Sequence, residues 1–133
     1  MSQEDVEIVR RSFDAWSSGD EDAIRDLYTD DVVIETPRGL TNLRETVEGD
    51  DPVGRWLAEN QEAWSETRWE VERIFEKGEA VVSFYRAVTV GRGSGVEVVR
   101  DLTAVHRIRD GKIAIERVYL DREKALEAAA QRE

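Results

Sequence analysis

The stretch Gly95–Leu120, GVEVVRDLTAVHRIRDGKIAIERVYL, predicts the sheet on which the rest of the chain is built. Two runs rich in β-branched residues flank Arg109–Lys112, and the Asp-Gly at its centre is a strong signal for a hairpin. A three-residue loop with Gly111 as a bulge would pair Ile108 with Lys112. A strict two-residue turn would shift the pairing by one residue and change which side chains share a face. We expect the bulged form.

The bulged pairing gives one face of this hairpin an unusual mixture of side chains. Most of its residues are apolar, but Arg100, His106 and Glu116 interrupt it. Ala104 would oppose Glu116 and His106 would oppose Ala114, so that His106 and Glu116 lie diagonally on adjacent strands. An ionisable group on a buried face must find a partner or mark a site. We therefore expect the functional site on this face.

Composition limits the classes of protein to which the chain can belong. It has 133 residues, of which 40% are hydrophobic, and residues 1–133 are expected to form one domain with one core. The net charge of −11 argues against nucleic acid and membranes as partners, because nucleic acid and anionic lipid both need a basic face. The N-terminus is acidic, so we expect no signal peptide. No apolar run approaches the length of a membrane span, so we expect none. We expect a cytoplasmic protein.

The same composition restricts metal and thiol chemistry. The chain has no cysteine, which excludes disulfides and thiolate ligands. It has one histidine, which excludes a metal site built from several histidines of one chain. We expect no metal and no cofactor.

Helical spacing and capping residues predict three helices before the main sheet. The first follows Ser2 and ends at Gly19, the second is capped by Asp20, and the third opens at Asp51 with Pro52 at its first position. The remaining expected elements are a turn at 29–31, a short strand at 32–34, a polar loop or flap at 38–51, strands at 68–76 and 81–90, the hairpin, and a helix at 121–131. Helices followed by antiparallel strands indicate an α+β fold.

Three segments carry a resemblance to a known family: Ser17–Asp20, Gly93–Val98 and Arg109–Leu126. Together with the strand that ends in Glu-Thr-Pro at 35–37, they resemble a SnoaL-like domain of the nuclear transport factor 2-like superfamily. Ketosteroid isomerase and polyketide cyclases are relatives. The resemblance implies a cone-shaped, strongly curved antiparallel sheet wrapped around N-terminal helices, an α+β barrel of the cystatin-like kind. It also implies a pocket at the open end and a homodimer.

Steroid isomerase chemistry is not expected from this resemblance. Ketosteroid isomerase uses an aspartate base, with a tyrosine and a protonated aspartate as oxyanion donors. The base position falls at Thr36, whose hydroxyl cannot accept a proton at neutral pH. The tyrosine position falls at Ser12, and the second aspartate position falls near Thr103 or Ala104.

The pocket implied by the resemblance has its own candidate residues. Glu116 and His106 are the catalytic candidates, and Arg86 would hold an anion or enolate. The other ligand-binding candidates lie on the expected pocket wall or its helical roof: Trp16, Tyr28, Trp56, Asn60, Phe84, Leu102, Val118 and Leu120. Structural interpretations stay open beside these. Glu116 could form a buried ion pair with Arg86 or Arg100, the tryptophans could be core residues, and Asn60 could cap a backbone group.

A mostly apolar pocket with a few polar groups predicts a soluble protein that binds a small, largely apolar organic molecule. One alternative is a cofactor-independent acid–base enzyme of the isomerase, cyclase, hydrolase or dehydratase type. Another is a non-catalytic dimerisation module whose cavity is filled by Trp56, Trp64 and Phe84. Convergence of Glu116 and His106 on an open pocket would favour the enzyme.

The opposite face of the sheet predicts a homodimer joined through the sheet. Its expected apolar residues are Val81, Tyr85, Val99, Val105, Ile113, Ile115 and Tyr119. So large an apolar surface is seldom left in water on a monomer.

Overall fold

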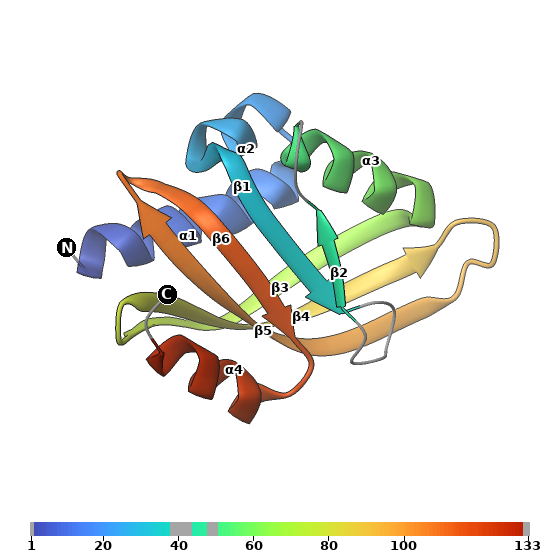
Figure 1. Cartoon of the computed structure of the whole chain (residues 1–133). Helices are drawn as coiled ribbons and strands as arrows, with labels where there is room; N and C mark the ends of the chain where they lie inside the picture. Colours follow the sequence, from blue (N-terminus) through green and yellow to red (C-terminus); the bar gives the residue numbers. More distant parts are fainter. Residues whose placement is uncertain (1, 38–43, 48–50, 132–133) are drawn as a thin grey trace.

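A computed structural model of the chain describes residues 2–37, 44–47 and 51–131. The elements, in chain order, are α1 (Ser2–Ser18), α2 (Glu21–Leu27), β1 (Tyr28–Pro37), β2 (Arg44–Val47), α3 (Pro52–Ala63), β3 (Trp64–Lys77), β4 (Ala80–Gly91), β5 (Glu97–Arg109), β6 (Lys112–Tyr119) and α4 (Arg122–Ala130). The six strands form one curved sheet in the order β2-β1-β6-β5-β4-β3 (Figure 1). All neighbouring strands are antiparallel except β1 and β6, which are parallel. The α+β fold is therefore confirmed, with one parallel pair that the sequence did not predict.

Capping residues fix the helix ends where the sequence predicts them. The Asp20 side chain accepts a hydrogen bond from the backbone N–H of Ala23 at the start of α2. Asp51 does the same for Gly54 at the start of α3, with Pro52 in the first turn. Asp121 caps α4. Each carboxylate satisfies backbone donors that have no partner inside the helix.

Helices cover both faces of the sheet. The side chains of α1, α2 and α3 pack with β1 and β6 on the concave face, in a cluster of Ala15, Ile24, Tyr28, Val32, Ile34, Val53 and Ile113. Helix α4 packs on the other face, where Ala125 and Ala129 contact the cluster of Ala80, Val82, Phe84 and Val105. None of the helices in the described part of the chain is long and apolar enough to cross a membrane.

The β5–β6 hairpin has a tighter turn than we expected. Arg109 pairs with Lys112, which leaves a two-residue loop of Asp110 (φ 53°) and Gly111 (φ 80°). The prediction of a three-residue loop is therefore wrong. Two positive φ angles match the type I′ turn, whose twist suits the flanking strands, and aspartate tolerates that conformation.

A bulge one step further along the hairpin changes the pairing again. Ile108 opposes Ile113, but Arg107 opposes Ile115, so that the register passes over Ala114. Beyond the bulge His106 lies directly opposite Glu116. The prediction that these two residues share a face is confirmed, although they are opposite rather than diagonal neighbours.

Strand β4 faces the other way from our expectation. Tyr85 pairs with Leu102, and Ser83 pairs with Ala104, which places Tyr85 on the concave face. Phe84 and Arg86 therefore lie on the outer face, where Phe84 packs in the α4 cluster. The expected facing was wrong because β4 is buried on both sides, so its sequence has no alternation of apolar and polar residues to fix it.

The surface expected to join a homodimer is accordingly different. Val81 and Tyr85 lie on the concave face, Val105 packs in the α4 cluster, and Ile113 belongs to the core against α2 and α3. Val99 remains half-exposed.

Two local predictions near the N-terminal half are also corrected. The expected turn at 29–31 lies inside β1, which is longer than the strand predicted at 32–34. The loop or flap expected at 38–51 contains β2 and ends at Asp51, the cap of α3, and residues 38–43 and 48–50 lie outside the described part of the chain.

Candidate functional site

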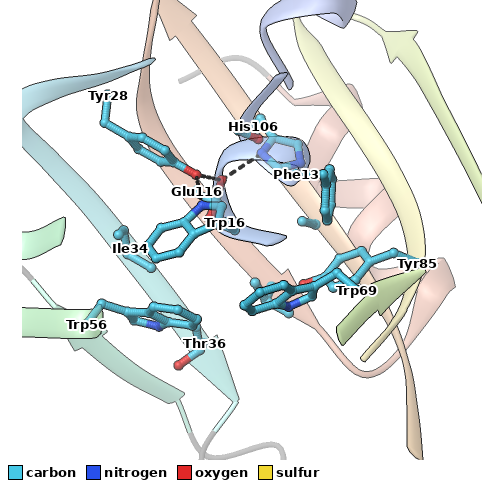
Figure 2. Close-up of a pocket in the computed structure, with 13 residues that line it drawn as sticks. Phe13, Trp16, Tyr28, Ile34, Thr36, Trp56, Trp69, Tyr85, His106 and Glu116 are labelled. Carbon is cyan, nitrogen blue, oxygen red and sulfur yellow. Dashed lines mark hydrogen bonds and ion pairs between the residues drawn. The ribbon is translucent and has the colours of Figure 1, made fainter. Parts of the chain in front are cut away.

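An inner chamber lies between the concave face of the sheet and helices α1 and α3 (Figure 2). Counting its opening to solvent, the space between its walls is about 430 Å³. Its lining residues come from seven elements: Ser12, Phe13, Trp16, Tyr28, Ile34, Thr36, Trp56, Trp69, Tyr85, Ala104, His106, Glu116 and Val118. Among these, Glu116 is the one carboxylate, and no lysine or arginine is present.

Glu116 lies at the centre of a chain of hydrogen bonds. Its Oε1 atom accepts from the hydroxyl of Tyr28 at 2.9 Å and contacts Nδ1 of His106 at 3.0 Å. The indole N–H of Trp16 donates to the Tyr28 oxygen at 2.9 Å. Figure 2 shows Tyr28 and His106 approaching the same carboxylate from two strands. Among the described residues both contacts go to Oε1, which leaves Oε2 as the oxygen that a ligand could reach.

Ser83 supports His106 from behind the chamber. Its hydroxyl lies 2.9 Å from Nε2 of His106. A serine, a histidine and a carboxylate in this order match the contacts of a hydrolase triad, but Ser83 is 0% exposed and does not line the chamber. Ser83 is therefore a positioning residue. When its hydroxyl donates to Nε2, the proton of neutral His106 sits on Nδ1 and points at Glu116.

Burial also holds two tyrosines in their protonated form. Loss of solvation, reinforced by the nearby Glu116 carboxylate, raises the pKa of Tyr28 well above its ordinary value. The same two causes raise the pKa of Tyr85. The hydroxyl of Tyr28 can thus keep donating to Glu116 across the physiological range.

We expect Tyr28 and Tyr85 to remain un-ionised in alkaline solution for as long as the chain stays folded. Because their folded-state pKa values are raised, the stabilisation that they contribute is complete below about pH 10 and is lost as the pH rises through the folded-state values. Absorbance titration near 295 nm should therefore show the same curve for the folded wild type and for the Tyr28→Phe and Tyr85→Phe variants. A tyrosinate signal that disappears in either variant before unfolding would contradict this.

Aromatic rings make up most of the chamber wall. The ring centroids of Trp16 and Trp56 are 4.8 Å apart, and those of Trp56 and Trp69 are 6.5 Å apart. Phe13 and Tyr85 meet edge to face at 5.0 Å. The interplanar angles of these pairs range from 36° to 68°, so the rings face the space from several directions.

An outer chamber continues from the inner one. The two share Thr36, Trp56, Trp69, Tyr85 and Val118, and the outer space is about 990 Å³ including its open side. Its further lining residues include Asn60, Trp64, Arg100 and Leu102. The guanidinium of Arg100 lies 5.8 Å from the ring centre of Trp64, and burial lowers its pKa.

The structure brings together most of the residues that the sequence singled out. Trp16, Tyr28, Trp56, His106, Glu116 and Val118 line the inner chamber, and Asn60 and Leu102 line the outer one. Leu120 packs behind the wall against the cluster that contains Tyr85 and Val118. Asn60 donates to the Thr67 hydroxyl at 3.3 Å rather than to a backbone group.

Two predicted site residues lie elsewhere. Arg86 is on the outer face, where its Nε donates to Asp101 at 3.1 Å. Phe84 lies beneath Arg122, whose guanidinium is 3.7 Å from the ring centre. The cation on the pocket face is Arg100, which the sequence marked as an interruption of that face.

Sequence reasoning missed Phe13, Trp69 and Tyr85 as lining residues. Trp69 could have been found from the alternation of strand β3, in which Trp69 is half-buried between two exposed neighbours. Thr36 and Ser12, which the resemblance matches to the isomerase's base and tyrosine, line the chamber, as does Ala104, one of the two residues matched to its second aspartate. The carboxylate of this chamber therefore comes from β6 and not from the isomerase position on β1.

Metal binding has little support in this site. In the part of the chain that the structure describes, no three histidine or carboxylate side chains are grouped so that they could hold a metal ion.

The curved sheet with helices on its concave side has the α+β fold of solved nuclear transport factor 2-like proteins. The SnoaL-like domain family matches residues 9–116, and the chain belongs to that family. None of the curated proteins matches the chain.

Solved structures share this fold at low sequence identity. TerC, co-crystallised with polyporic acid, is 20% identical, with a TM-score of 0.75 over 93% of this chain and 98% of that one. An LEH-like epoxide hydrolase of M. tuberculosis is 20% identical, with a TM-score of 0.73 over 96% and 90%. A protein of Catenulispora acidiphila with a ketosteroid isomerase-like fold, in complex with trimethylamine, is 16% identical, with a TM-score of 0.73 over 95% and 94%.

Proposed function

We propose that this protein binds a small, largely apolar organic molecule in the inner chamber, with Oε2 of Glu116 as its polar anchor. The observation that carries the proposal is a single carboxylate, 14% exposed, in a chamber otherwise walled mostly by aromatic and aliphatic side chains. Such a chamber matches the usual character of small-molecule sites. Relatives with this fold that hold polyporic acid or trimethylamine support the same class of function.

The dimerisation module with a filled cavity is the weaker alternative. Trp56 and Trp64 line the two chambers without closing them, and Phe84 is on the other face of the sheet.

Native mass spectrometry of freshly purified protein tests the binding proposal. We expect a retained organic ligand on the wild type. The Val118→Phe variant, which adds a ring to the chamber wall, should lose it, and Val71→Phe on the exposed surface should keep it. The proposal fails if the wild type carries no ligand and no compound of a broad organic panel raises its melting temperature. It also fails if Val118→Phe retains the same ligand.

A second candidate function is cofactor-independent acid–base catalysis at the same site. The convergence of His106 and Tyr28 on one oxygen of Glu116 favours it, because a held carboxylate with one open oxygen is placed to accept a proton from a bound molecule. The relative that is an LEH-like epoxide hydrolase shows that enzymes occur on this fold. Turnover of any substrate should fall by about 10²–10⁴-fold in Glu116→Gln. Unchanged turnover would exclude Glu116 as the base.

We also propose that the chain forms a homodimer in the cytoplasm, as expected for a relative of this family. Val99 is an exposed apolar residue on the outer face of the sheet and supports a smaller contact than the sequence suggested. Sedimentation at micromolar concentration measures the assembly state, and a clean monomer would refute the dimer.

A further inference from the structure

We propose that the inner chamber selects an organic cation, namely an alkylated ammonium group, as the head of its ligand. This inference rests on the proposed binding function and specifies the chemical class of the ligand. The feature that carries it is the combination of the Glu116 carboxylate with an aromatic wall on the same small space.

The first argument is the charge of the chamber. Glu116 receives its hydrogen bonds from a phenol and an imidazole, and within the described residues it has no ion pair with lysine or arginine. The arginines at positions 86, 100 and 117 do not supply one. Arg86 is on the outer face, Arg100 lies beside Trp64 in the outer chamber, and Arg117 pairs with Glu35. A carboxylate in a chamber of low polarity is most stable when a bound cation lies close to it.

The second argument is the aromatic wall. Trp16, Trp56 and Trp69 have ring centroids 4.8–6.5 Å from one another and face the space at different angles. Tyr85 and Phe13 close another side. The faces of such rings carry negative potential and attract ammonium groups, and quaternary ammonium ions are commonly recognised by cages of this composition. A neutral apolar head would gain contact with the rings but nothing from the carboxylate.

The third argument is the position of the two charges along the site. The carboxylate is in the inner chamber and Arg100 is in the outer one. A ligand whose positive head lies inward keeps that head near Glu116 and places its tail toward Arg100. The net charge of −11 favours the approach of a cation to the protein as a whole.

The test compares choline with 3,3-dimethyl-1-butanol, which has the same shape but a carbon in place of the charged nitrogen. Binding can be followed by tryptophan emission and confirmed by calorimetry. Each of the four tryptophans lines at least one of the two chambers: Trp16, Trp56, Trp64 and Trp69. We expect choline to bind at least about tenfold more tightly than the alcohol. In Glu116→Gln the ratio of the two dissociation constants should fall toward one.

A matched control separates the chamber from the general surface charge. Glu127 is an exposed carboxylate on α4, on the far face of the sheet, so Glu127→Gln should leave the ratio unchanged. Should Glu116→Gln fail to fold, Trp56→Leu provides a second variant, in which choline binding should weaken several-fold more than binding of the alcohol.

The outcomes distinguish this inference from the proposed function. If the alcohol, or other neutral compounds of an organic panel, bind in the chamber as tightly as choline, the cation inference is overturned while small-molecule binding stands. A preference for choline that is as large in Glu116→Gln as in the wild type also overturns it. If neither probe binds and no ligand of any kind is found, the binding function fails together with the inference.

Discussion

Replacing Glu116 with leucine is expected to lower the free energy of unfolding by about 2–4 kcal/mol. The substitution removes the acceptor shared by the Tyr28 hydroxyl and Nδ1 of His106. Tyr28 is 2% exposed and His106 is 1% exposed, so water cannot readily replace the lost partner. Each buried donor left without an acceptor costs about 1–3 kcal/mol. Denaturant unfolding measures the difference.

The Glu116→Gln variant is the matched comparison. Its amide oxygen can still accept from Tyr28 and His106, so we expect the loss to be less than half of that in Glu116→Leu. If Glu116→Leu is more stable than the wild type, the carboxylate destabilises the fold. Its presence would then have to be explained by function alone, as in other sites that trade stability for activity.

Replacing Ala125 with aspartate is expected to lower stability by about 3–5 kcal/mol, because it buries a charge without a partner. Ala125 is 0% exposed and packs with Val82, Phe84 and Val105 beneath α4. Chemical denaturation at neutral pH should show the loss. Part of the loss should be recovered in acid, because the carboxyl group is then neutral and less costly to bury.

Lys124→Asp provides the control for this prediction. It introduces the same side chain at the preceding position of α4, where the residue is exposed and near the helix N-terminus. Its effect should lie within about 0.5 kcal/mol of zero. Equal losses in the two variants would mean that helix propensity, and not burial against the sheet, determines the cost.

The ends of the helices could be predicted from the sequence because their determinants are local. Asp20, Asp51 and Asp121 each act on backbone groups within three residues. The hairpin at Asp110-Gly111 was likewise evident, although its loop length was not, since aspartate and glycine fit both a two-residue and a three-residue loop.

The facing of β4 could not be predicted, because it depends on an element distant in sequence. Helix α4 covers the outer face of this strand, which lets apolar residues occupy both sides. Phe84 and Tyr85 are both buried, and nothing within the strand says which of them faces the chamber. For the same reason Arg86 was assigned to the wrong face, and the surface expected to form a dimer was overestimated.

The polar residues of the candidate site could be predicted from the sequence, but several aromatic residues of its wall could not. Glu116 and His106 stood out because they interrupt an apolar pattern. Trp69 and Phe13 were missed because an aromatic residue among apolar neighbours looks the same whether it lines a cavity or fills a core. The support from Ser83 depends on β4 pairing with β5, which only the folded sheet determines.

The bulge at Ala114 has a consequence for how such chains diverge. Side chains along a strand point alternately to the two faces of the sheet. After the two-residue turn, the extra residue in β6 is what places Glu116 on the same face as His106. Deletion of Ala114 would let the two strands pair without a bulge, with Arg107 still opposite Ile115 and His106 still opposite Glu116, so the carboxylate would stay on the chamber side. Relatives with a one-residue gap at this point would keep the chamber's charge, whereas a one-residue insertion that no second bulge absorbs would put the glutamate opposite Val105, on the α4 side of the sheet. Residue identity by itself is therefore a poor guide to which of them share its chemistry.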